Sequence, residues 1–244
     1  MLAVTSAREE ILGKISLALK SEANSETKSR PARASSFDEQ APLARRLALE
    51  IRSRCERERA GLIEQFESEL LKIGVHIHHA ATIDSAAEYI EQTALERGAK
   101  TVIAADAEVV ETIGLQKRLD SNGIRYVTEA SGGEFRPIAI EAGIGVSGVD
   151  YALADTGTLV LLARKGQARS ISLLPPVHIA IVKPDQIVSG LDDLFQLLRF
   201  EKGVSDLGSA VTLITGASRT ADIELTLVVG VHGPQELHVV IIED

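Results

Sequence analysis

Polar side chains that can bind an anion are concentrated in the last quarter of the sequence. Residues 218–224 read Ser-Arg-Thr-Ala-Asp-Ile-Glu, and residues 231–234 read Val-His-Gly-Pro. Apolar runs at 211–214 and 237–242 flank these segments, so the polar groups stand where buried strands are expected to end. Arginine offers a planar fork of donors to a carboxylate or phosphate, and open α/β sheets bind ligands beyond the carboxyl ends of their strands. The pattern predicts a small-anion site, although a helix cap and tight turn with Arg219 in a structural ion pair would also explain it.

A second polar segment, Asp155-Thr156-Gly157-Thr158, precedes the apolar run 159–162. A turn that enters a strand presents its carboxylate and hydroxyls at a sheet edge, where Asp155 could act as a general acid or base. Asp and Thr side chains also hydrogen-bond their own backbone in turns, which is the structural alternative.

We expect the two polar segments to converge on one site at one side of the sheet. The candidate catalytic residues are Asp155, Asp222 and Glu224. The candidate ligand-binding residues are Thr156, Gly157, Thr158, His178, Ser218, Arg219, Thr220, His232 and Gly233. His178 begins a predicted buried strand and could equally be a satisfied core residue, whereas His232 stands in a turn.

Residues 143–148 match the pattern G-x-G-x-x-G. In a dinucleotide-binding fold this pattern opens a long helix and an acidic residue follows about 20 positions later. Here the 155–158 turn follows after a few residues. We therefore expect a strand end and a short helical turn, not a cofactor site.

Metal and iron–sulfur sites are not expected within this chain. His76 and His78 would share one strand face, but Val75 and Ile77 supply the inward face, so the histidines are expected to face solvent. The single cysteine, Cys55, excludes an internal disulfide and a cysteine-rich cluster site built from this chain alone.

Composition narrows the class of protein. The chain has 244 residues, of which 45% are hydrophobic. Its net charge of −9 and its low aromatic content of 3% argue against nucleic-acid binding. Residues 1–20 lack the apolar core of a signal peptide, and no apolar run approaches the roughly 20 residues of a membrane span. We expect a soluble cytoplasmic protein.

The chain is predicted to consist of an N-terminal appendage, residues 1–41, and one domain, residues 42–244. A capping box at 6–9 starts a helix, and residues 20–41, rich in Ser, Ala, Glu and Lys, indicate a flexible linker.

Within the domain, helical patterns alternate with apolar runs. Helices are expected at 42–73, 85–97, 108–123 and 192–200, and strands at 75–79, 101–105, 124–127, 158–163, 178–182, 211–215 and 237–242. This order predicts an α/β fold with a mixed, largely parallel sheet and helices on both faces.

Five segments together resemble the LUD domain, and more closely the lactate-utilisation protein C (LutC/YkgG) family. They are residues 143–150, 154–159, 173–179, 214–224 and 230–234. The resemblance covers about residues 42–244. Asp155 stands where the family often has Glu, which shortens the reach of the carboxylate, and Ala217 stands where it often has Pro.

The resemblance implies a fold similar to the ribose-5-phosphate isomerase/CoA-transferase superfamily. It also implies a role in oxidation of L-lactate to pyruvate beside two iron–sulfur partner proteins. Three functions follow as hypotheses: a component of that system without cofactors of its own, which binds a small carboxylate or phosphate; an autonomous isomerase or CoA-transferase-like enzyme acting on a small phosphorylated or acyl ligand; and an interaction module.

Overall fold

The computed structural model describes residue 14 and residues 41–132, 134–202, 208–221 and 227–243. The chain divides into two compact units, Met1–Leu43 and Ala44–Asp244. The predicted N-terminal helix and linker lie almost entirely outside the described residues. In the described part of the chain, no helix is both long enough and apolar enough to span a membrane.

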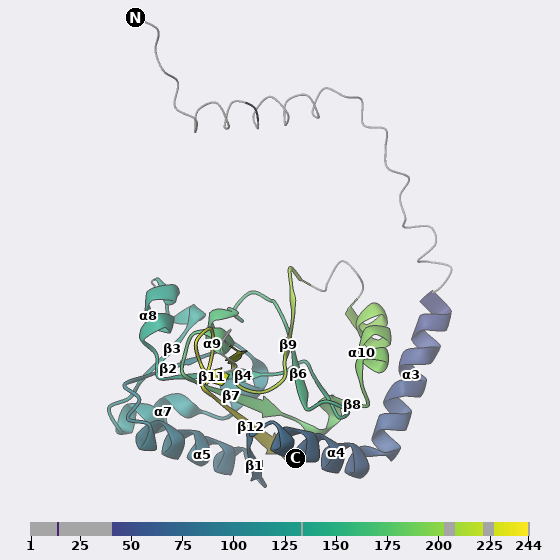
Figure 1. The fold of residues 1–244 in the computed structure, drawn as a ribbon, viewed down its shortest axis with the longest axis horizontal. Coiled ribbons are helices and arrows are strands. Elements are labelled where there is room, and N and C mark those ends of the chain that lie inside the picture. The colour runs from purple at the N-terminus through teal and green to yellow at the C-terminus, as the bar shows by residue number, and fades with distance from the viewer. Residues whose placement is uncertain (1–13, 15–40, 133, 203–207, 222–226, 244) are drawn as a thin grey trace, which may run out of the picture. The chain divides into compact units, whose positions relative to one another are not determined.

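A six-stranded sheet forms the centre of the second unit (Figure 1). Its strands, in order across the sheet, are β1 (His76–Ala80), β12 (Glu236–Ile242), β7 (Val177–Val182), β4 (Ile144–Gly148), β2 (Thr101–Ala104) and β3 (Arg125–Thr128). Every neighbouring pair is parallel. All six residues of β7 are buried, because layers cover both faces of the sheet. The structure confirms the predicted α/β class.

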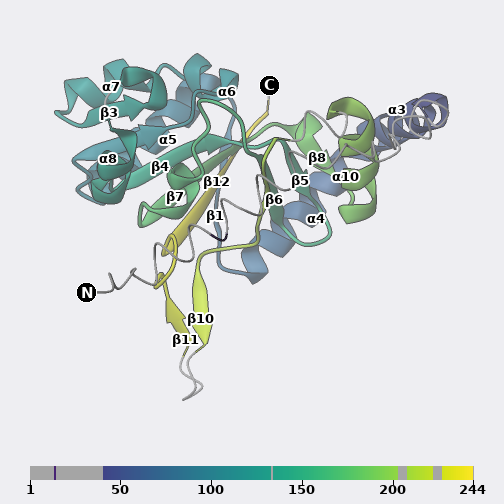
Figure 2. The same ribbon diagram turned by 90° about the horizontal axis from the view of Figure 1, so that it is seen from above.

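Helices α5 (Ile83–Glu96), α6 (Glu108–Thr112) and α7 (Leu115–Ser121) cover one face of this sheet (Figure 2). Thr82 caps α5 by accepting a hydrogen bond from the Ser85 amide at 3.1 Å. The helix expected over 108–123 is broken into α6 and α7 at Gly114, which has φ +66°. A positive φ cannot continue a right-handed helix, so the chain turns there.

The opposite face packs against helices and a second, four-stranded sheet. The helices on this side include α3 (Ala41–Arg57), α4 (Arg59–Lys72), α8 (Phe135–Glu141) and α9 (Ser170–Leu173). The second sheet has the strand order β8 (Ile187–Val188), β5 (Tyr151–Leu153), β6 (Thr158–Leu162) and β9 (Val211–Ile214). The expected strands at 158–163 and 211–215 therefore pair with each other outside the main sheet. The expected helix at 42–73 is two helices, separated at Glu58.

The other described elements are short. They are η1 (Glu129–Ser131), η2 (Pro184–Gln186), α10 (Leu191–Leu197), the π-helical turn η3 (Leu198–Lys202), β10 (Arg219–Ala221) and β11 (Leu227–Val229). Strands β10 and β11 pair antiparallel as a hairpin that extends away from both sheets (Figure 2).

The strand order creates a switch point between β2 and β4. The chain leaves β2 towards α6 on one face of the main sheet, and it leaves β4 towards β5 on the other face. Because neighbouring loops depart in opposite directions, a crevice opens at the carboxyl ends of these two strands.

The glycine-rich motif at 143–148 forms the whole of β4 and does not open a helix, so the short helical turn expected there is wrong. A Cβ atom on Gly145 would overlap the carbonyl oxygen of Ile171 in α9. Glycine at this position therefore allows α9 to pack directly on the sheet, and α9 in turn helps to enclose the crevice.

Candidate functional site

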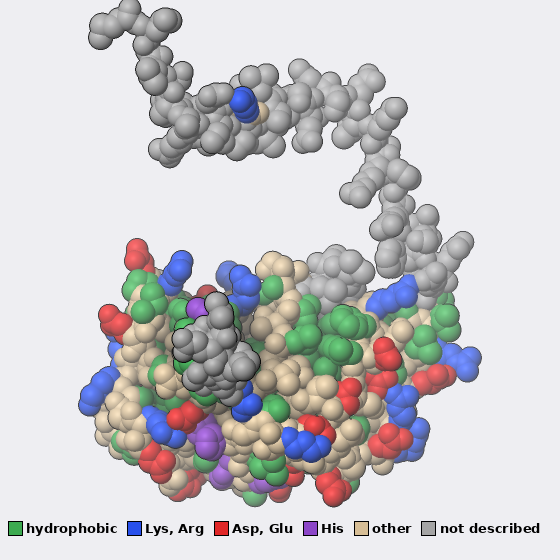
Figure 3. All heavy atoms as spheres, viewed as in Figure 1, with side chains coloured by type: hydrophobic (Ala, Val, Ile, Leu, Met, Phe, Trp, Pro, Cys, Tyr) green, Lys and Arg blue, Asp and Glu red, His purple; other side chains and the backbone are tan. Residues whose placement is uncertain are grey.

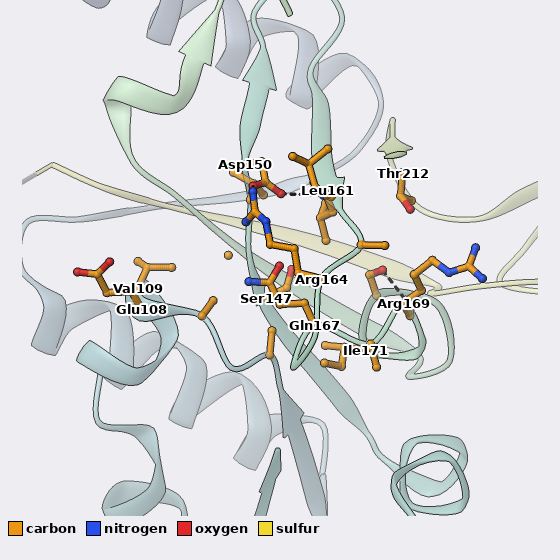
Figure 4. Close-up of a pocket in the computed structure, with 18 of the residues that line it drawn as sticks. Glu108, Val109, Ser147, Asp150, Leu161, Arg164, Gln167, Arg169, Ile171 and Thr212 are labelled. Atoms are coloured by element: carbon orange, nitrogen blue, oxygen red, sulfur yellow. Dashed lines mark hydrogen bonds and ion pairs between the residues drawn. The ribbon is translucent and has the colours of Figure 1, made fainter. Parts of the chain in front are cut away.

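A cavity of about 310 Å³ occupies the crevice at the carboxyl ends of β2 and β4 (Figure 4). Its walls come from the segments that follow β2, β4 and β7, from the end of β6, and from the turn and helix α9 that follow β6. The polar residues among its lining are Glu108, Ser147, Asp150, Arg164, Gln167, Arg169, Ser172, Lys183, Gln186 and Thr212. This is the position where open α/β sheets bind their ligands.

Asp150 and Arg164 form an ion pair in the wall of the cavity. The Asp150 side chain is 10% exposed, and its Oδ2 atom accepts a hydrogen bond from the Leu162 amide at 2.7 Å. Arg164 begins a tight turn in which the Gln167 amide donates to the Arg164 carbonyl at 3.1 Å. The Asp106 amide donates to the Gly166 carbonyl at 2.8 Å, which fixes this turn against the loop after β2.

Positive side chains outnumber negative ones around the cavity. Arg164, Arg169 and Lys183 face two carboxylates, Glu108 and Asp150, in a protein whose net charge is −9. Figure 4 shows the Arg164 guanidinium at the centre of the group and turned towards Asp150, while Arg169 lies at the edge of the group with its guanidinium pointing away from the other labelled residues. Asp150 pairs with Arg164, so Arg169 and Lys183 against Glu108 leave an excess of one positive charge among the described lining residues, which favours an anion.

A buried histidine supports one hydroxyl of the cavity wall. His178 Nε2 lies 2.9 Å from Ser147 Oγ, and the His178 side chain is 0% exposed. Burial, with a smaller contribution from nearby His238, lowers the His178 pKa to about 4, so the imidazole is neutral at pH 7. Its Nδ1 atom is buried without a hydrogen-bond partner. The pair holds the Ser147 hydroxyl in place but leaves His178 itself outside the lining.

The predicted turn at 155–158 forms a chain of hydroxyl contacts between β6 and β9. Thr156 donates to Asp155 Oδ1 at 3.1 Å, Thr156 and Thr158 are joined at 2.8 Å, and Thr158 reaches Thr215 at 2.8 Å. Gly157, with φ +65°, packs against the backbone of Glu69 and Leu70 in α4. Residues 155–158 do not line the cavity at the carboxyl ends of β2 and β4.

The described part of the predicted segment 218–224 lies beside the predicted segment 231–234. The Ser218 amide donates to the Pro234 carbonyl at 2.8 Å, and the Gly230 amide donates to the Ser218 carbonyl at 2.8 Å. Arg219 is exposed, and its guanidinium donates to the carbonyl of Ile73 at the end of α4.

The remaining predicted residues have these positions. Gly233 packs against Ser218, His232 is exposed, and Thr220 lies in β10. Asp222 and Glu224 fall outside the described residues. The 155–158 and 215–219 segments both contact the carboxyl end of α4, and none of their residues lines the cavity.

The cavity residues Ser147, Asp150, Arg164, Arg169 and Lys183 were not among the sequence-based candidates. One signal was available: Arg-Lys-Gly-Gln at 164–167 directly follows the apolar run of β6. A basic turn at the end of a buried strand can bind an anion, which is the role expected of Arg219 from the sequence. Only the strand order places it opposite the end of β4.

Comparisons with known proteins identify relatives of the whole domain. A family model described as the LUD domain matches residues 63–242. Lactate utilization protein C of Halalkalibacterium halodurans is 33% identical over 163 residues, which cover 66% of this chain and 71% of that protein. The uncharacterized protein YkgG of Escherichia coli is 30% identical over 217 residues, 88% of this chain and 93% of that protein.

A solved structure has the same fold. The crystal structure of a DUF162 family protein from Deinococcus radiodurans aligns with a TM-score of 0.56 and 24% identity, covering 75% of this chain and 98% of that one. The family match spans most of the second unit, including both sheets and the residues around the cavity. The chain therefore belongs to the LUD domain family.

Proposed function

We propose that this protein serves lactate utilisation as a component of an iron–sulfur system that oxidises L-lactate to pyruvate. Its own task in that system is to bind a small carboxylate or phosphate, and its partners are iron–sulfur proteins. The observation that carries the proposal is the cavity at the carboxyl ends of β2 and β4, with its excess of cationic side chains.

The names of relatives support the metabolic context. Lactate utilization protein C of three bacteria, Halalkalibacterium halodurans, Macrococcus caseolyticus and Anoxybacillus flavithermus, is 33–36% identical to this chain. L-lactate and pyruvate are both small carboxylates, so a cavity that favours an anion suits either one. Ser147 and Gln167 add neutral hydrogen-bonding groups that could contact a hydroxyl or keto oxygen.

The composition of the chain supports the assignment of clusters to partners. Iron–sulfur clusters are held by several cysteine thiolates. This chain has one cysteine, Cys55, which is buried, and burial raises the pKa of its thiol. We therefore assign the clusters to partner proteins.

The purified chain alone should produce no pyruvate from L-lactate above the blank when an artificial electron acceptor is supplied. Oxidation of a 2-hydroxy acid needs a redox group to accept its electrons, and the proposal assigns that group to the partners. Addition of the iron–sulfur partners should restore pyruvate formation. Robust turnover by the isolated chain, measured as pyruvate released over time, would contradict this division of labour.

A second candidate function is an autonomous enzyme acting on a small phosphorylated or acyl ligand. The observation that favours it is the hydroxyl of Ser147, which stands in the cavity wall 2.9 Å from the imidazole of His178. A serine beside a neutral imidazole is a recurrent arrangement for proton transfer. Turnover of sugar phosphates or acyl-CoA by the isolated chain, lost in Ser147→Ala, would favour this function over the first.

A further inference from the structure

We propose that His76, Glu236 and His238 form a Zn²⁺ site at the amino-terminal end of strands β1 and β12. The parallel register places His76 directly opposite His238, and Glu236 lies two residues before His238 on the same face of β12. One ligand atom from each residue lies within 4.8 Å of the others. Two imidazoles and one carboxylate are a zinc donor set that leaves a fourth position for water.

The site is separate from the cavity proposed to bind the carboxylate. His76 and Glu236 are the first residues of their strands, whereas the cavity lies at the carboxyl ends of β2 and β4. The zinc proposal therefore stands independently of the proposed function.

His238 is already held in the orientation that a metal ligand needs. Its side chain is 5% exposed, and the Tyr89 hydroxyl lies 2.8 Å from its Nδ1 atom. Tyr89 is itself stacked on His78, with ring centroids 4.1 Å apart. The other nitrogen of the His238 ring, Nε2, faces Glu236 Oε2 at 3.2 Å. Metal-binding histidines commonly have their second ring nitrogen fixed by a hydrogen bond in this way.

The Glu236 carboxylate supplies the negative charge of the proposed site. Arg97 contacts Glu236 Oε2 at 2.7 Å and His238 faces the same oxygen, so the carboxylate has a second oxygen to offer.

His76 supplies the ligand that can move. It is exposed and stacks on His238 with ring centroids 4.5 Å apart and an angle of 28° between the planes. Ligand atoms around tetrahedral zinc are about 3.4 Å apart, so a modest rotation of this surface side chain would close the site. Figure 3 shows histidine side chains at the surface near α5 and β1. The ion would tie the edge strand β1 to β12.

The test is a zinc titration of the full-length chain, freed of tags and metals, in competition with a chromophoric chelator. The wild type should bind about one Zn²⁺ per chain and should not bind Mg²⁺, which prefers oxygen ligands. His76→Gln and Glu236→Gln should each weaken zinc binding about tenfold or more. Circular dichroism of each variant confirms that it is folded.

His79→Gln is the matched control. His79 belongs to the same strand, but it faces Glu67 and Glu243, 3.2 and 3.6 Å away, and is not part of the proposed set. Zinc affinity should be unchanged in this variant. The proposal is overturned if the wild type binds no zinc, if His76→Gln binds it as tightly as the wild type, or if His79→Gln weakens binding as much as His76→Gln.

Discussion

Replacement of Gly145 with alanine should lower the free energy of unfolding by about 3 kcal/mol. The new Cβ atom would overlap the carbonyl oxygen of Ile171, which is backbone and cannot rotate away as a flexible side chain would. Helix α9 must therefore move off β4. Because Ile171 and Ser172 line the cavity, ligand binding should weaken together with stability. Chemical denaturation of the variant and the wild type measures the difference.

Gly61→Ala is the control for this substitution. Gly61 lies inside α4, and an added Cβ atom would meet nothing within 4 Å. Alanine is the better helix former, so this variant should be more stable than the wild type by up to about 1 kcal/mol. A Gly145→Ala variant that stays within about 0.5 kcal/mol of the wild type would show that α9 does not pack on β4 as described.

Acidification from pH 7 to pH 4 should remove about 3 kcal/mol of stability through His178 alone. The His178 pKa is about 4 in the folded protein, below the ordinary value of 6.5 that the unfolded chain should show. Between these values the unfolded chain binds a proton that the folded protein does not. The stability is therefore fully present above pH 6.5 and is lost as the pH falls towards 4.

His178→Gln isolates this contribution, because glutamine cannot titrate yet keeps a polar group beside Ser147. Denaturation curves at several pH values should show a shallower loss of stability for the variant than for the wild type. Burial also lowers the pKa of His78 and His238, so both proteins should retain some acid sensitivity of the same sign. His232→Gln, at an exposed position, should follow the wild type. Parallel curves for His178→Gln and the wild type would contradict the buried, neutral state of His178.

The fold class could be predicted because the order of helices and strands follows from local patterns of apolar and polar residues. Alternating apolar runs and amphipathic stretches located five of the six strands of the main sheet to within one or two residues, but β4 was expected only as a strand end followed by a short helical turn. The break at Glu58 has no proline or glycine to mark it, so α3 and α4 were expected as one helix. Strand β5 was not expected, because its three residues are too few to show the alternation of apolar and polar residues that marks a strand.

The cavity could not be predicted, because it depends on which strands become neighbours. Asp150 and Arg164 meet only because β5 and β6 fold back on the end of β4. The local motif around Arg219 was visible, but its guanidinium contacts the carbonyl of Ile73, 146 positions earlier in the chain. Sequence identifies residue types with suitable chemistry, whereas long-range pairing decides which of them share a site.

Calorimetric titration with pyruvate, L-lactate and inorganic phosphate measures whether a small anion binds in the cavity at the carboxyl ends of β2 and β4. A double variant, Arg169→Gln with Lys183→Gln, removes the two cations that Asp150 does not neutralise. Because a charged hydrogen bond contributes about 1.5–3 kcal/mol, this variant should bind the preferred anion at least about tenfold more weakly.

Two control variants show whether the loss of anion affinity is specific to the cavity. Arg125→Gln removes a positive charge at the opposite end of the sheet, at the start of β3, and should leave affinity unchanged. Arg219→Lys removes the fork of the sequence-predicted site while keeping its charge, and it should change affinity by less than about threefold if the cavity is the binding site. We expect binding to weaken in the double variant and to stay at the wild-type level in both controls. Unchanged binding in the double variant, with affinity lost in Arg219→Lys, would rule out the cavity as the binding site and place the ligand beside β10.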